Sequence, residues 1–210
     1  MNLKSNILAR TEEGLINMLE TQDLQGKWQS PEIETVNNPD GSVMYIHREA
    51  SFVEDNWSIK IRSYLDKKGK EPFFTIHAKG NYILSGESDY VKEATCVDFN
   101  NTGRYVTAHH TALVDMLNEV SVDTEWNLEE EHDVSINGCA LVPSIDNCPV
   151  EYDIIQINDN KIYFGEFTPD QKEDIQKFTR GDIEPSEDTA GICSVDNRPR
   201  QLMSYPLVHD

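Results

Sequence analysis

The sequence has few basic residues and no long hydrophobic run. Its 210 residues include 18 lysines and arginines against 38 aspartates and glutamates, which gives a formal charge of −20 at pH 7. Such a surface repels nucleic acid phosphates and anionic lipid headgroups, so we expect neither as a partner. A membrane-spanning helix needs about 20 consecutive apolar residues, and no stretch approaches that length. We therefore expect no membrane insertion.

Cysteine is also scarce. The four cysteines are Cys96, Cys139, Cys148 and Cys193. They form no C-x-x-C pair and no paired Cys/His motif, which excludes the usual zinc spacings. A reducing compartment would favour free thiols, whereas an oxidising one would allow Cys139 and Cys148 to close a small loop. We expect free thiols, and no metal site.

Segments and motifs with a known task are missing too. The apolar run at the start of the chain is too short for a signal peptide, because Arg10, Glu12 and Glu13 interrupt it, and a cytoplasmic location is expected. There is no Ser/His/Asp elbow, phosphate loop or H-E-x-x-H motif. His109 and His110 are adjacent and project in different directions, so they do not suggest a metal site. We expect no cofactor.

What the sequence does contain is the period-two alternation of β-strands. Strands are predicted at 42–52, 57–65, 73–84, 89–99, 125–136, 139–143, 151–157 and 161–167. Helical spacing of apolar residues predicts two short helices, within 11–20 and 107–120. Eight antiparallel strands exceed what an open sheet holds without curling. The expected fold is all-β: an antiparallel, calycin-like or lipocalin-like barrel or a strongly curved sheet.

We expect a single domain over residues 1–210. Residues 1–22 form an N-terminal helical segment, and 23–167 form the barrel. The polar, acidic stretch 168–188 is expected to be a loop or flap at the barrel mouth, because long loops in compact domains tend to be functional. The apolar-rich segment 189–210 is expected to pack back on the barrel.

Several motifs in order along the chain resemble one family. They are "LQGKWQS" (24–30), Phe52, Trp57, "PFFTIHAKGNY" (72–82), "TALVDMLN" (111–118), "EWNLEEEHDVSINGCA" (125–140), "EYDI" (151–154), "YFG" (163–165) and "RPRQLMSYPLV" (198–208). The chain is similar in these to the domain of the adenomatosis polyposis coli down-regulated proteins. The resemblance implies a β-barrel whose apolar cavity accepts a lipid.

The resemblance has limits. In animals the family consists of membrane-anchored, extracellular inhibitors of Wnt signalling with two such domains. For this chain we expect a single copy with no leader or anchor, and only Cys139 falls on a family cysteine. We therefore expect a stand-alone, bacterial relative whose cavity has another use, and do not extend Wnt inhibition to it.

Aromatic and polar residues on the predicted strands supply the candidate site. The tryptophans Trp28, Trp57 and Trp126 match the family's, and core packing explains them best. Trp28, close to Gly26, is expected to be buried at a closed end of the barrel. The candidates for lining a ligand cavity are Trp57, Tyr64, Phe74, Ile76 and Tyr82.

Two further residues, Arg62 and His77, are the candidates for polar or catalytic work. On faces that point inward, they would hold a carboxylate head or move a proton; on faces that point outward, they are ordinary surface residues. The function expected from these features is binding of a small hydrophobic or lipid-like molecule. The alternative is a cytoplasmic biosynthetic enzyme, of the cyclase or isomerase type, that folds an apolar substrate in the same cavity as part of specialised metabolism.

Overall fold

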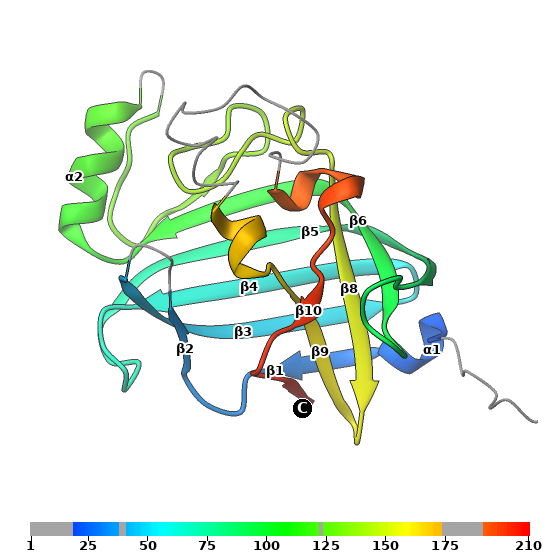
Figure 1. Ribbon diagram of the computed structural model, residues 1–210. Coiled ribbons are helices and arrows are strands. Elements are labelled where there is room, and N and C mark those ends of the chain that lie inside the picture. The colour runs from blue at the N-terminus through cyan, green and yellow to red at the C-terminus, as the bar shows by residue number, and fades with distance from the viewer. Residues whose placement is uncertain (1–18, 38–40, 122–123, 174–190) are drawn as a thin grey trace, which may run out of the picture.

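The computed structural model describes residues 19–37, 41–121, 124–173 and 191–210. Its main feature is a curved antiparallel sheet of eleven strands (Figure 1). The strands are β1 (Gly26–Gln29), β2 (Glu34–Asn37), β3 (Val43–Val53), β4 (Asn56–Tyr64), β5 (Pro72–Glu87), β6 (Thr95–Ala108), β7 (Glu131–Asp133), β8 (Val150–Asn158), β9 (Lys161–Glu166), β10 (Gln201–Leu202) and β11 (Leu207–His209). The helices are α1 (Thr21–Leu24), α2 (Thr111–Val120) and the 3-10 turns η2 (Gly191–Cys193) and η3 (Val195–Asn197), and residues 169–173 are helical as well.

The sheet closes into a ring. Its strands follow the order β1-β11-β9-β8-β6-β5-β4-β3, and β1 pairs again with β3 from Gly26 opposite Phe52 to Gln29 opposite Glu49. The C-terminal strand β11 lies between β1 and β9 and so completes the circle. Closure leaves fewer unpaired strand edges than an open sheet. The prediction of an all-β antiparallel barrel is confirmed.

The strands predicted at 42–52, 57–65, 73–84, 151–157 and 161–167 are present with small shifts of their ends. The prediction for 89–99 is wrong in extent, since β6 begins at Thr95 and continues to Ala108. The register between β5 and β6 shifts near Gly80, where a Cβ would lie 1.8 Å from the carbonyl oxygen of Asn100. Because of this irregularity the period-two alternation does not continue unchanged into the second half of β6, so the sequence pattern did not predict that half as a strand.

Residues 124–149 differ most from the prediction. Only Glu131–Asp133 of the expected strand 125–136 pairs with β6, and the expected strand 139–143 is a single bridge between Cys139 and Val142. Trp126 and Val134 are nevertheless buried, because this segment packs against β6 and α2 as a loop. The apolar residues of this segment therefore correctly indicated burial, although they do not belong to a strand.

The helix predicted within 107–120 is confirmed as α2, which begins at Thr111 because the imidazole of His110 caps it by accepting from the N–H of Ala112. None of the helices in the described ranges is long and apolar enough to cross a membrane. The helix predicted at 11–20 lies almost wholly outside the described residues, as does most of the predicted loop or flap 168–188. Where this stretch is described, the prediction of a loop is wrong: residues 169–173 are helical, and the buried Gln171 donates to Oδ1 of Asn197.

The core has two parts on the inner face of the sheet. The first gathers Leu24, Trp28, Ala50, Phe52, Trp57, Ala78, Tyr82, Val97, Phe99, Ile155, Ile162, Phe164 and Leu207. The second joins Val106 and Ala108 to α2 and to Trp126. Trp28 is 4 % exposed and its Nε1 donates to the carbonyl of Leu24 at 2.7 Å, so its predicted burial is confirmed.

A disulfide joins Cys148 to Cys193, while Cys96 and Cys139 are free. Both expectations from the sequence, four free thiols or a Cys139–Cys148 pair, are therefore wrong. The two bonded residues are 45 positions apart, and the fold brings their Cα atoms to 5.2 Å. Spacing along the chain does not reveal such a pairing.

Candidate functional site: an apolar cavity inside the barrel

A cavity of about 220 Å³ lies on the inner side of the ring. Its lining comes from β3, β4, β6, β8, β9 and the C-terminal segment: Ile46, Arg48, Ala50, Phe52, Trp57, Ser58, Ile59, Ile61, Phe99, Glu151, Asp153, Phe164, Gly165, Ile192 and Met203. Side chains alternate between the faces of a strand, so the even positions of β3 and the odd positions of β4 point inward. The alternation seen in the sequence thus builds most of the wall.

Four aromatic rings form the centre of this wall. Phe99 lies 4.5 Å from Trp57 and 6.4 Å from Phe164, between ring centroids. The ring of Phe52 is also 6.4 Å from that of Phe99. These rings come from four different strands, and large aromatic side chains of this kind form rigid apolar surfaces.

The segment after η2 covers the cavity. Ile192 of η2 and Met203 both line it, and the N–H of Met203 donates to the carbonyl of Phe164 at 2.9 Å. The disulfide of Cys193 ties this cover to Cys148, and β10 pairs with β9 (Figure 1). The cover is therefore fixed to the barrel at both of its ends.

Arg48 is the first charged group in the wall, and it is neutralised. Its Nε donates to both carboxylate oxygens of Glu34, at 2.9 and 3.2 Å. Its Nη2 donates to the carbonyl of Tyr205 at 2.7 Å. Arg48 is 3 % exposed and Glu34 is fully buried. A buried ion pair with its hydrogen bonds filled holds β2, β3 and the C-terminal segment together, and leaves no free charge.

Glu151 is also paired. Its carboxylate accepts from Nη2 of Arg104 at 2.7 Å. The same buried guanidinium donates to the carbonyls of Pro143 and Cys148, at 2.8 and 3.0 Å. Arg104 therefore fastens the loop before β8 to the barrel wall, and this pair too is neutral overall.

Asp153 is the third charged group in the wall, after Arg48 and Glu151. Its Oδ1 accepts two backbone N–H groups, from Ile154 at 2.7 Å and from Gly165 at 3.0 Å. Burial raises the pKa of this carboxyl from 3.8 to about 7, against the opposing effect of the two N–H groups; Glu151 raises it further and Arg48 lowers it. Within the described ranges no Lys, Arg or His lies at ion-pair distance from Asp153.

Gly165 is needed for this arrangement. A Cβ built at this position would lie 2.4 Å from Oδ1 of Asp153 and 2.4 Å from Cβ of Pro199. Only a residue without a side chain lets β9 approach the carboxyl closely enough for its N–H to donate.

Of the five residues predicted to line a ligand cavity, the structure brings Trp57 into the wall. Tyr82 belongs to the same core, 5.2 Å from Phe52, but its hydroxyl points to the carbonyl of Glu54. Phe74 and Ile76 pack against the second core cluster. Tyr64 is half-buried and, as an even-numbered residue of β4, is on the face opposite to the inward side chains.

Arg62 and His77 are on the outer face of the sheet and are not brought into the cavity. Nε of Arg62 donates to Oγ1 of Thr75 at 3.2 Å. The ring of His77 packs 5.5 Å from that of Tyr105, with Glu131 at 3.8 Å, and burial lowers its pKa. Their neighbours on the same strands, Ile61 and Ala78, occupy the inner face. The polar groups that do line the cavity, above all Asp153, were missed from the sequence.

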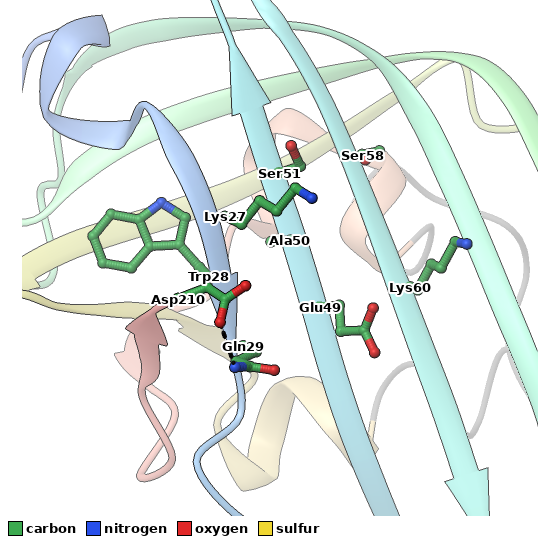
Figure 2. Close-up of a pocket in the computed structure, with 9 residues that line it drawn as sticks. All are labelled: Lys27, Trp28, Gln29, Glu49, Ala50, Ser51, Ser58, Lys60 and Asp210. Carbon is green, nitrogen blue, oxygen red and sulfur yellow. Dashed lines mark hydrogen bonds between the residues drawn. The ribbon is translucent and has the colours of Figure 1, made fainter.

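A second hollow lies on the outer surface across β1, β3 and β4 (Figure 2). It measures about 170 Å³ and is lined by Lys27, Trp28, Gln29, Glu49, Ala50, Ser51, Ser58, Lys60 and Asp210. Figure 2 shows its ammonium and carboxylate groups interspersed over the strands. Lysine and acidic side chains make up much of this lining, whereas four aromatic rings stand in the wall of the barrel cavity, so the barrel cavity is the better candidate site.

The matches to known proteins agree with the motifs noted above. Residues 6–135 match the family described as adenomatosis polyposis coli down-regulated 1. This stretch is more than half of the chain and runs from before β1 to just after β7. It includes Trp28, Phe52 and Trp57, and it ends before Asp153. The chain therefore belongs to the adenomatosis polyposis coli down-regulated 1 family.

Proposed function

We propose that this protein binds one small hydrophobic molecule in the barrel cavity. The observation that carries the proposal is a cavity on the inner side of the barrel with four aromatic rings in its wall and few polar groups, which is the usual composition of small-molecule sites. Its volume of about 220 Å³ is below the range of roughly 300–1,000 Å³ typical of sites for drug-sized ligands. The ligand is accordingly small, or only its apolar part enters the barrel.

The disulfide bears on where the protein works. Disulfides persist in oxidising compartments and are rare in the cytosol. Because Cys148–Cys193 fixes the cover of the cavity, we propose that the protein functions in an oxidising compartment, in place of the cytoplasm expected from the sequence.

An enzyme of the cyclase or isomerase type is the second candidate, and one observation favours it. A carboxyl whose pKa lies near neutrality in an apolar cavity suits general acid or base catalysis, and Asp153 fits that description. Binding alone remains our first proposal, because Arg48 and Glu151 are both engaged in ion pairs and leave Asp153 without a catalytic partner.

A calorimetric titration with 1-heptanol tests the proposal. Ala50 lines the cavity, whereas Ser51 is the next residue of β3 and faces outward. Ala50→Leu should fill the cavity and weaken heptanol binding by at least about tenfold, while Ser51→Leu adds a similar side chain outside and should leave it unchanged. Thermal melts would establish that both variants fold. Equal binding by the two variants, or no binding to the parent protein, would overturn the proposal.

A further inference from the structure

We propose that the ligand of this cavity is a small apolar amine, whose ammonium group pairs with the carboxylate of Asp153. The inference rests on the proposed function of the same cavity and adds the chemical class of the ligand. It follows from the balance of charges inside the barrel and from the nature of its walls.

Among the charged side chains inside the barrel, one carboxyl has no cationic partner in the described residues. Glu34 is paired with Arg48, and Glu151 is paired with Arg104. Asp153 lines the same cavity, is 7 % exposed and has no cationic partner among the described residues. Buried charges in proteins are generally paired, so a lone carboxylate must hold a proton or meet a cation. A ligand ammonium supplies that cation.

The remaining polar contacts of Asp153 are compatible with this role. Both hydrogen bonds that it makes to the backbone go to Oδ1. They hold the carboxyl in place between β8 and β9 and are made to an oxygen that stays an acceptor in either protonation state. Oδ2 is then the atom that accepts from an ammonium N–H.

The walls favour a cation as well. The rings of Phe52, Trp57 and Phe164 surround that of Phe99. Aromatic faces attract ammonium groups through their quadrupoles, most strongly where water is excluded, and aromatic cages are a recurring way to bind alkylated amines. The guanidinium of Arg48 already lies over Phe164, at 5.7 Å from the ring centroid, so one cation and one ring of the wall have this arrangement.

Other head groups fit less well. A carboxylate ligand would meet Asp153 and Glu151 in a low-dielectric space while both arginines are engaged, and it would have to reach the site against a net charge of −20. A neutral alcohol would fill the same volume and leave the acid without a counter-charge. An amine both fills the space and supplies the missing charge.

The experiment compares three probes of equal length: heptylamine, 1-heptanol and heptanoate. By calorimetry at pH 8 the amine should bind the parent protein at least about tenfold more tightly than the alcohol, and heptanoate should bind weakest. Asp153→Asn should reduce the preference for the amine to about twofold or less. Asp159→Asn removes the same charge at an exposed hairpin position whose φ of 50° suits asparagine, and it should keep the full preference.

A second measurement needs no variant. Charged groups reach Asp153 from Glu151 on its own strand and from Arg48 on β3, while β9 contributes only the N–H of Gly165, and Arg198 donates to the backbone carbonyl of Asp153. With a pKa of about 7, the carboxyl is largely protonated at pH 6. Heptylamine binding at pH 6 should therefore release close to one proton, measured by calorimetry in buffers of different ionisation enthalpy, and heptanol should release none.

The outcomes separate the two proposals. If the amine and the alcohol bind equally well, or Asp153→Asn keeps the preference, or no proton is released, the amine is the wrong class and the cavity still binds apolar molecules. If none of the probes binds, the proposed function fails together with this inference.

Discussion

Replacing Asp153 by Asn should make the protein more stable at pH 8 and leave it nearly unchanged at low pH. The folded state raises the pKa of Asp153 from 3.8 to about 7, a change of about three units. At about 1.36 kcal/mol per unit, this corresponds to about 4 kcal/mol. Because the folded pKa is the higher one, this stabilisation is fully present below about pH 3.8 and is lost as the pH rises through about 7.

Between pH 5 and pH 8 the parent protein should lose about 3 kcal/mol of the total through this one group. Asparagine keeps an oxygen that accepts from the N–H groups of Ile154 and Gly165 and does not titrate. Urea unfolding of the parent protein and of Asp153→Asn at several pH values gives the difference between their free energies of unfolding. The contributions of the other acidic groups are the same in both proteins and cancel in this difference. The difference should grow by about 3 kcal/mol in favour of Asp153→Asn from pH 5 to pH 8.

Asp159→Asn is the control and should show no such trend, because Asp159 is exposed at the β8–β9 turn. A difference between Asp153→Asn and the parent that stays constant with pH would refute the reasoning. It would mean that the carboxyl is solvated or has found a cation in the free protein.

Two further changes have calculable effects. Trp28→Ala should lower the free energy of unfolding by about 3–5 kcal/mol in urea, because the indole is 4 % exposed and its Nε1 is hydrogen bonded; a loss below about 1 kcal/mol would contradict this. Opening the Cys148–Cys193 disulfide frees a loop of 45 residues, which by loop-closure entropy costs about 4 kcal/mol, and equal urea midpoints for the oxidised protein and a double serine variant would show that the bond does not constrain the chain.

The strands β3, β4 and β5 were predictable because each carries one clearly apolar face. Trp57, Ile59 and Ile61 alternate with polar residues along β4, and the structure turns the apolar set inward. The short strands β1, β2 and β11 have too few residues for a period to show, and they are held by pairing with distant segments. The ring therefore closes through pairings between strands far apart in the sequence, which the alternation within one strand does not predict.

The candidate site was predictable only in part. The alternation along β4 already placed Arg62 and Trp57 on different faces of the sheet, and the alternation along β5 did the same for His77 and Ala78. Both patterns argue for an outer position of Arg62 and His77. No comparable pattern marks Asp153. The neighbouring Ile154 is also buried, so β8 is covered on both faces and shows no polar side from which an inward acid would stand out.

The choice of aspartate at position 153 links stability to function. The two backbone N–H groups need only an acceptor, which asparagine supplies without a titrating group. With its pKa raised to about 7, the aspartate is expected to lower stability near neutral pH, and buried residues with this effect are characteristic of functional sites. A cationic ligand would restore that stability on binding, since it supplies the cationic partner that Asp153 lacks among the described residues. A variant Asp153→Asn that is more stable at pH 8 and has lost its preference for heptylamine would therefore show one carboxyl acting in both roles.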